Sequence, residues 1–193
     1  MKIGIFGGTF NPPHKMHKQI AILLKNENYV DKVIFVPTGN SYDRKDLNNE
    51  LDRLNMVNLM IKNYPFLESS DIEFGKKRVY TYQTLNYFKE KYKNDEIYFI
   101  CGADNINDLM TWKNYQYILD NFKILVINRN NEKIKIKHPN IILTDIKLNE
   151  LSSTYIRNNI KCDLNGLVDE DIIRYIKERH LYEWSCLSIN RTK

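Results

Sequence analysis

Short apolar runs alternate with amphipathic stretches along almost the whole chain. The run KIGIFGG (2–8) is short and continuously apolar, as in a strand that is buried on both faces. Residues 50–63 instead place their apolar side chains on one face of a helix. Further strands are predicted at 32–37, 66–74, 96–102, 122–129 and 140–146, and further helices at 16–27, 81–92, 115–121, 153–160 and 169–179. This alternation predicts an α/β fold in which helices wrap both faces of a parallel sheet.

The length of 193 residues is enough for one domain with a core of its own. We expect this domain to span 1–183 and to be followed by a C-terminal tail at 184–193, where no periodic pattern is found. The first residues do not show the pattern of a signal peptide, so none is expected. The sequence has no apolar run of membrane-spanning length and only three scattered cysteines. We therefore expect a cytoplasmic protein without a disulfide framework or a zinc site. The net charge of +5 favours anionic ligands only weakly.

Ligands of such folds bind at the carboxyl ends of the strands, near the point where the strand order reverses. Three segments follow predicted strands at that edge of the sheet. They are GGTF at the end of 2–8, PTGN at the end of 32–37 and GADN at the end of 96–102.

The first of these segments continues as GGTFNPPHKMH (7–17). Gly7 and Gly8 let a ligand approach the backbone closely, and the helix that follows presents a partly positive amino end. His14 and His17 are three residues apart, so both imidazoles leave the same face of its first turn. The set would suit a polyphosphate, with an ordinary turn and a surface histidine pair as the alternative. The two histidines alone are too few ligands for zinc, and the chain has neither a P-loop nor a dinucleotide fingerprint.

Two motifs far apart in the chain resemble those of one enzyme family. GGTFNPPHKMH is similar to the GxFxPxHxGH signature of the nucleotidyltransferase superfamily of adenylyl- and cytidylyltransferases. LSSTYIRNNI (151–160) resembles the ISSTxIR signature of the nicotinate and nicotinamide mononucleotide adenylyltransferases. Other segments resemble the bacterial nicotinate branch, at 78–88, 97–119 and 169–183. The resemblance covers residues 2–183 and implies a Rossmann-like doubly wound parallel sheet of the nucleotidyltransferase type.

The resemblance also implies an activity and a set of site residues. AMP would be transferred from ATP to nicotinate mononucleotide, giving nicotinic acid adenine dinucleotide and pyrophosphate in NAD biosynthesis. Mg²⁺ would come with the ATP, so no dedicated metal ligands are expected. The family pattern makes His14, His17 and Arg157 catalytic. It places ATP at Gly7, Gly8, Thr9, Phe10, Gly102, Asp104, Ser153 and Thr154, and the mononucleotide at Lys45, Thr81, Trp112 and Lys113.

Several of these residues also have plainer interpretations. Residues 152–154 are good N-cap residues, so SSTYIR could open an ordinary surface helix with an incidental arginine. Asp104 could be a helix N-cap, and Trp112 could be a core residue. Lys113 stands where family members often have an aromatic residue, and its charge could favour the nicotinate carboxylate over the neutral amide.

The chain departs from the family pattern at two places. Met16 replaces the usual Gly of HxGH, as in the eukaryotic-type enzymes of the group, which leaves the substrate choice open. Segment 38–47 replaces a PHK stretch of the bacterial members, with Arg44 and Lys45 as possible substitutes. The sequence does not indicate a role for Arg53 or Arg129.

Other functions remain open alongside the implied one. The acceptor could be nicotinamide mononucleotide, or another small-molecule phosphate or alcohol. Outside the enzyme class, the basic run at 76–78 leaves a nucleotide-binding regulator or an RNA-binding module as an alternative. We expect ATP and nicotinate mononucleotide as partners, no nucleic acid and no membrane, with a homo-oligomer possible.

Overall fold

The computed structural model describes residues 1–40, 47–128, 133–146, 152–160, 164 and 166–182. In this part of the chain, six strands form one sheet in the order β3-β2-β1-β4-β5-β6, and every neighbouring pair is parallel. The strands are β1 (Lys2–Gly8), β2 (Lys32–Pro37), β3 (Leu67–Ser69), β4 (Glu96–Gly102), β5 (Lys123–Ile127) and β6 (Ile141–Leu143). The predicted doubly wound parallel sheet is confirmed, with its strand order reversing between β1 and β4.

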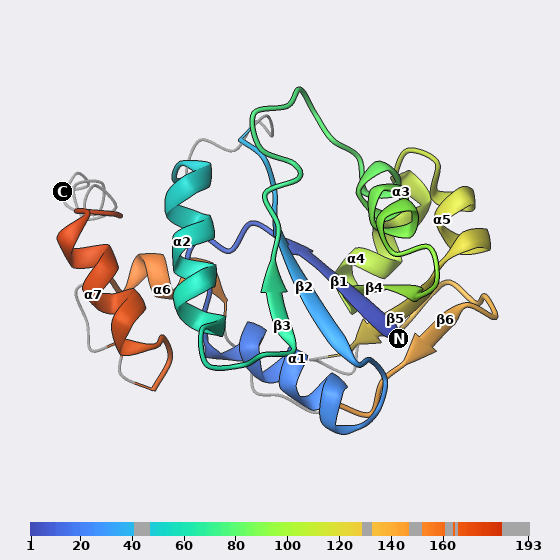
Figure 1. The fold of residues 1–193 in the computed structure, drawn as a ribbon, viewed down its shortest axis with the longest axis horizontal. Coiled ribbons are helices and arrows are strands. Elements are labelled where there is room, and N and C mark those ends of the chain that lie inside the picture. Colours follow the sequence, from blue (N-terminus) through green and yellow to red (C-terminus); the bar gives the residue numbers. More distant parts are fainter. Residues whose placement is uncertain (41–46, 129–132, 147–151, 161–163, 165, 183–193) are drawn as a thin grey trace, which may run out of the picture.

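Helices cover both faces of this sheet (Figure 1). They are α1 (Lys15–Asn26), α2 (Glu50–Ile61), α3 (Thr81–Lys91), α4 (Ala103–Asp108), α5 (Tyr115–Asn121), α6 (Ser153–Asn158) and α7 (Glu170–Glu178), with a short 3₁₀ turn, η1, at Leu109–Thr111. Figure 1 shows α2, α6 and α7 on one side of the sheet and α3, α4 and α5 on the other. None of the helices in the described ranges is long and apolar enough to cross a membrane.

Alternate side chains of the strands pack into two separate hydrophobic cores, one on each face of the sheet. On β1, Ile3 and Ile5 join the core under α3, α4 and α5, whereas Phe6 joins the core under α1, α2 and α7. On β2, Phe35 lies on the same side as Phe6. Strands that are buried on both faces therefore explain why the sequence shows continuous apolar runs instead of alternation.

The strand predicted at 66–74 is wrong in length, because β3 ends at Ser69. Its last ladder contact is the amide of Ser70 donating to the carbonyl of Phe35 at 2.9 Å. The chain then turns, with the amide of Phe74 donating to Asp71 at 2.8 Å. Polar residues at 68–71 suit the partly solvated edge of the sheet but do not continue a strand. The sixth strand is likewise shorter than predicted. The helix α4 and the turn η1 are too short to give a periodic signal.

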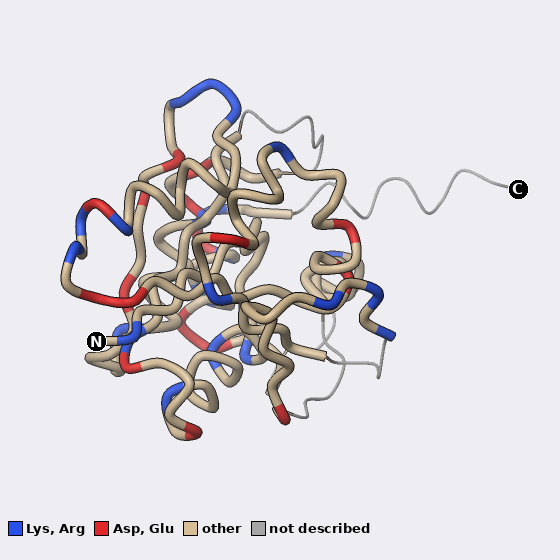
Figure 2. The backbone as a smooth tube through the Cα atoms, turned by 90° about the vertical axis from the view of Figure 1, so that its right-hand side faces the viewer, with Lys and Arg blue, Asp and Glu red and all other residues tan. Residues whose placement is uncertain are grey.

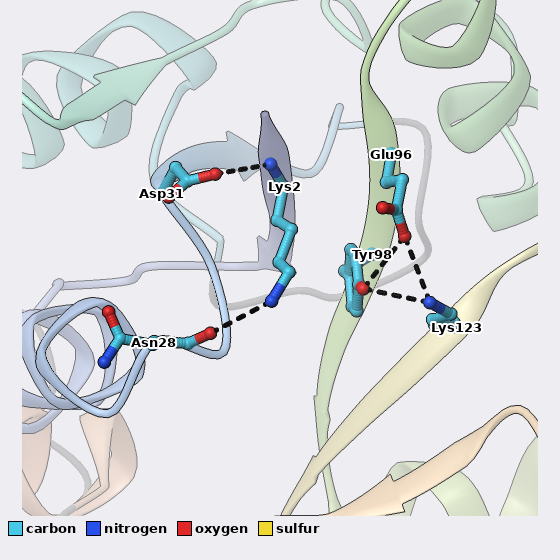
Figure 3. Close-up of polar contacts among 6 residues, drawn as sticks. All are labelled: Lys2, Asn28, Asp31, Glu96, Tyr98 and Lys123. Carbon is cyan, nitrogen blue, oxygen red and sulfur yellow. Dashed lines mark hydrogen bonds and ion pairs between the residues drawn. The ribbon is translucent and has the colours of Figure 1, made fainter.

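The amino ends of the strands are closed by polar contacts (Figure 3). The amide of Lys2 donates to Asp31 Oδ2 at 2.7 Å, and Lys2 Nζ donates to the carbonyl of Asn28 at 3.3 Å. Across β4 and β5, Lys123 Nζ lies 3.0 Å from Glu96 Oε2. This exposed ion pair contributes little to stability, because solvent screens it. All of these contacts lie at the amino ends of the strands, and a ligand site is expected at the opposite, carboxyl ends.

Candidate functional site

A cavity of about 780 Å³ opens at the carboxyl ends of β1 and β4, where the strand order reverses. Its walls come from the loops that follow β1, β2 and β4, from the start of α3 and from the segment after η1. Seven of the predicted site residues line it, namely Gly7, Gly8, Thr9, Thr81, Asp104, Trp112 and Lys113. The volume is in the range of pockets that hold small molecules.

The loop after β1 is held down by Phe10, whose side chain is 1% exposed. Phe10 adopts a φ of 46°, a left-handed conformation that few non-glycine residues adopt. Its ring packs against Phe6 and Phe35, at centroid distances of 5.9 and 5.5 Å. A Cβ on Gly8 would lie only 3.0 Å from this ring, so a larger residue there would require the ring to shift by a few tenths of an ångström. Phe10 can therefore offer a ligand its main chain only, since its side chain belongs to the core.

The two histidines stack on each other at the start of α1. Their ring centroids are 3.7 Å apart and the ring planes differ by 27°. His14 is the N-cap residue, and its amide donates to Nδ1 of His17 at 3.2 Å. Because Nδ1 of His17 is an acceptor, the proton of the neutral ring is on Nε2, which makes that atom a donor. Met16, the departure from the family pattern, is buried among core residues of the same helix.

The amino end of α6 docks on the loop that precedes α1. Ser153 Oγ donates to the carbonyl of Pro12 at 2.8 Å, and Arg157 Nη1 donates to the carbonyl of Asn11 at 2.8 Å. Arg157 Nη2 also lies 3.2 Å from Oγ1 of Thr154. Ser152 caps the helix by accepting from the amide of residue 155 at 3.1 Å. The helix is capped as an ordinary surface helix would be, but its arginine is directed to the loop that precedes the two histidines.

The start of α4 places a carboxylate at the cavity. A Cβ on Gly102 would lie 2.4 Å from Oδ1 of Asp104, so the glycine leaves room for this side chain. The N-cap of α4 is Gly102, and Asp104 lies in the first turn instead. Cys101 also lines the cavity, but burial raises the pKa of its thiol well above the usual range, which leaves it unreactive.

The far wall of the cavity combines aromatic rings with two cations. Trp112 is half-buried and packs edge-on against Phe99, with centroids 6.0 Å apart. Lys113 Nζ lies 4.7 Å from the ring centroid of Tyr80, and the guanidinium carbon of Arg78 lies 5.6 Å from the same ring. Trp112 is thus both a packing residue and part of the cavity wall.

Not all predicted site residues lie in the cavity wall. His14, His17, Ser153, Thr154 and Arg157 gather around residues 10–12 and are not among the residues that line the cavity. Lys45 and the tail at 184–193 lie outside the described residues, as does Arg44.

The basic loop at 76–78 is exposed and forms the blue stretch at the top of Figure 2. Its last residue, Arg78, is also in the cavity wall. The basic run therefore reaches the site itself, a role that was not predicted for Arg78.

Two buried charged residues at the site have no counterpart in the sequence-based prediction. Glu73 lines the cavity and accepts a hydrogen bond from Oγ1 of Thr84 at 2.6 Å. Burial raises the pKa of Glu73, and the bond from Thr84 partly offsets this. Arg53 is fully buried beneath the loops after β1 and β2. The burial of Arg53 could have been predicted from its position in the helix. It lies four residues before Val57 and seven before Met60, on the apolar face.

Comparison with known proteins agrees with this architecture. The sequence profile of the cytidylyltransferase-like family matches residues 5–159. A probable nicotinate-nucleotide adenylyltransferase of Flavobacterium psychrophilum is 39% identical over 192 residues, which cover 95% of this chain and all of the relative. One of Clostridium tetani is 36% identical over 94% of this chain and 98% of its own length.

Solved structures give the same result. The Plasmodium falciparum nicotinic acid mononucleotide adenylyltransferase complexed with NaAD superposes with a TM-score of 0.78 and 25% sequence identity. The superposition covers 94% of this chain and 97% of that protein. The likeness thus extends over the sheet and over the helices on both of its faces.

Proposed function

This chain belongs to the cytidylyltransferase-like family, and we propose that it transfers the adenylyl group of ATP to nicotinate mononucleotide. The products are nicotinic acid adenine dinucleotide and pyrophosphate, which makes this a step of NAD biosynthesis. The observation that carries the proposal is the match to relatives of that name over nearly the full length of both chains. A solved neighbour that is complexed with NaAD supports the same product.

In the reaction, an oxygen of the mononucleotide phosphate forms a bond to the α-phosphorus of ATP. The bond from that phosphorus to the oxygen bridging to the β-phosphate breaks, and the electron pair leaves with pyrophosphate. Such transfers need little covalent chemistry from the protein, so positioning and charge stabilisation dominate. A cavity with glycine-rich and cationic walls and with an unreactive, buried thiol is consistent with this mode.

His17 is proposed to donate from Nε2 to the phosphate oxygens on which charge develops. The contact of its Nδ1 with the amide of His14 fixes the tautomer that makes this possible. Arg157 is proposed to supply positive charge at the same place, since its contact with Asn11 directs it to the loop before α1. Gly7, Gly8 and Thr9 line the cavity, and their amides are proposed to bind the nucleotide phosphates.

The mononucleotide is proposed to occupy the wall near Trp112 and the start of α3. Thr81 is the first residue of α3, an 11-residue helix whose amino end favours a negative group. Lys113 and Arg78 flank the ring of Tyr80 beside it. These cations favour a ring that carries a carboxylate over one that carries a neutral amide.

Mg²⁺ is proposed to arrive with ATP and to be held mainly by phosphate oxygens and water. In the described ranges no group of three or more His, Cys, Asp and Glu side chains could hold a metal ion. Bound Mg²⁺ would neutralise phosphate charge, while the chain's own donors orient the phosphates.

The test is a direct assay with ATP and Mg²⁺ and with nicotinate or nicotinamide mononucleotide as acceptor. Pyrophosphate release and the dinucleotide product are measured for each. We expect turnover with the acid and much weaker turnover with the amide. Turnover with the amide alone would contradict the proposed acceptor. Turnover with neither, together with salt-sensitive RNA binding, would contradict the proposed reaction.

A further inference from the structure

Arg53 is a fully buried arginine on α2 that the proposed reaction does not use. Its side chain is 0% exposed and lies on the same helical face as Val57 and Met60, which belong to the core. Charged side chains are rarely buried to this extent unless their donors are satisfied. Its place in the interior therefore calls for a specific set of partners.

The guanidinium donates to four acceptors on three stretches of chain. Nη1 donates to the carbonyl of Thr9 at 2.8 Å, after β1. Nη2 donates to the carbonyl of Thr38 at 2.5 Å and to Oδ1 of Asn40 at 2.8 Å, after β2. Nε donates to the carbonyl of Asn48 at 3.0 Å, just before α2. One planar group thus joins two loops of the site to the helix that supports them.

Two of these partners, Thr9 and Thr38, line the cavity. The loops also contact each other directly, because the amide of Thr38 donates to the carbonyl of Gly8 at 2.9 Å. Glu50, one turn before Arg53, adds a third segment. Its carboxylate accepts from the amide of Asn40 at 2.7 Å and from that of Gly75 at 3.2 Å. The first turns of α2 therefore hold the loops on either side of the cavity.

The partners of Arg53 also explain why the residue is an arginine. All four acceptors are carbonyl or amide oxygens that approach a flat group from different sides. A lysine ammonium has three donors on one nitrogen and cannot reproduce this fork. Burial lowers the pKa of Arg53 to about 10, so the group remains protonated at neutral pH.

We propose that Arg53 is a positioning residue that fixes Thr9 and Thr38 at the separation which the two bound substrates require. In-line transfer needs the attacking oxygen and the α-phosphorus to meet in one geometry, and a shift of about 1 Å can cost on the order of 10²-fold in rate. This inference rests on the proposed function, because it assigns Arg53 a role in aligning ATP and the mononucleotide.

Arg53→Met and Arg53→Lys test the inference against Asp52→Asn as a matched control. Asp52 is the neighbouring residue and is 2% exposed. Its carboxylate accepts from Tyr175 Oη at 2.7 Å, from Arg179 Nε at 3.2 Å and from the side chain of Asn49, the N-cap residue of α2. None of these partners lines the cavity. The measurements are kcat and KM for both substrates, the Tm, and the affinity for α,β-methylene ATP by calorimetry.

For Arg53→Met we expect kcat to fall on the order of 10²-fold, with affinity for the ATP analogue within about fivefold of wild type. For Arg53→Lys we expect an intermediate loss of kcat of about tenfold, because lysine keeps the positive charge but lacks the planar set of donors of the guanidinium. Asp52→Asn should lower the Tm but leave kcat unchanged. A folded Arg53→Met protein whose kcat stays within about threefold of wild type would overturn the inference.

Other outcomes are also decisive. If Arg53→Met does not fold, a folded Arg53→Lys protein with wild-type kcat would overturn the inference. If neither variant folds, the Nε–H resonance of Arg53 in the wild-type protein should shift when α,β-methylene ATP and nicotinate mononucleotide bind together, and an unchanged resonance would overturn it. Absence of dinucleotide product from the wild-type protein would overturn both this inference and the proposed function.

Discussion

Arg157 donates from Nη1 to the main-chain oxygen of Asn11 at 2.8 Å, across 146 residues of sequence. Beside this bond, Ser153 Oγ donates to the carbonyl of Pro12 at 2.8 Å. The two motifs that suggested an adenylyltransferase are therefore in direct contact. Four residues after Asn11, α1 begins, and its first turn carries His17. The guanidinium and the imidazoles thus approach the same loop from two different helices.

We predict that Arg157→Gln lowers kcat by on the order of 10²-fold, as is usual when a donor to transition-state charge is removed. Pyrophosphate release measures the effect. Lys18→Met is the control, because Lys18 pairs with Asp169 at 2.5 Å and also ties α1 to the C-terminal segment. It should lower the Tm and leave kcat near wild type. Equal losses of kcat in both variants would mean that Arg157 acts only by docking α6.

We predict that the two roles of His17 can be separated. His17→Ala loses the acceptor for the amide of His14 and should destabilise the protein by about 1 kcal/mol, the usual cost of a lost helix cap. It should also lower kcat on the order of 10²–10³-fold. His17→Gln should recover the stability, because glutamine at this helix position can accept the same bond. Thermal unfolding and kcat are compared, and recovery of kcat in the Gln variant would contradict a catalytic imidazole.

Lys113 is predicted to contribute to acceptor choice. Removing its charge in Lys113→Met should reduce the preference for nicotinate over nicotinamide mononucleotide by up to about fivefold, the effect of one partly exposed ion pair. The ratio of kcat/KM for the two acceptors measures it. Lys77→Met makes the same charge change on the exposed loop, away from the cavity wall, and should leave the ratio alone. An unchanged ratio in Lys113→Met would show that Lys113 does not contribute to the choice of acceptor.

We predict that the stability of the protein depends on pH through Glu73. Burial raises its pKa above the ordinary 4.5, although Thr84, Gly39 and the charges of Lys76 and Arg53 act in the opposite direction. The folded state holds the proton of Glu73 more tightly than the unfolded chain does. The protonated side chain therefore stabilises the fold at any pH below its ordinary pKa, and this stabilisation is lost as the pH rises through its raised pKa in the folded state.

Glu73→Gln keeps an oxygen for Thr84 and does not ionise. The Tm of this variant relative to that of wild type should therefore increase as the pH rises from about 4.5, until the carboxyl of Glu73 is fully ionised in the wild-type protein. Thermal unfolding between about pH 4 and pH 8 tests this. Parallel curves for the two proteins over the whole range would show that the pKa of Glu73 is not raised.

Much of the fold could be predicted from the sequence because its strands are buried on both faces. After a charged first residue, the runs at 2–8, 32–37 and 96–102 are apolar, and the structure has β1, β2 and β4 at the same bounds. Edge elements were predicted less well, since β3 and β6 are only three residues long and pair on one side only. The short, polar helix α4 has no periodicity to detect.

The site was predictable only where local sequence determines it. Glycines after a strand and histidines in a first helical turn are local features, and the cavity lies beside that loop. Arg53 and Glu73 were not found, because their roles depend on loops that the fold brings together from distant parts of the chain. The burial of Phe10 was also not predicted, because a core position within a glycine-rich turn depends on the packing of β1 against β2.

A structure of the protein with α,β-methylene ATP bound would show whether His17 and Arg157 contact the triphosphate. We predict that His17 Nε2 and the guanidinium of Arg157 both lie within hydrogen-bond distance, about 3 Å, of the triphosphate oxygens. A triphosphate bound elsewhere, or contacted by neither side chain, would contradict the account.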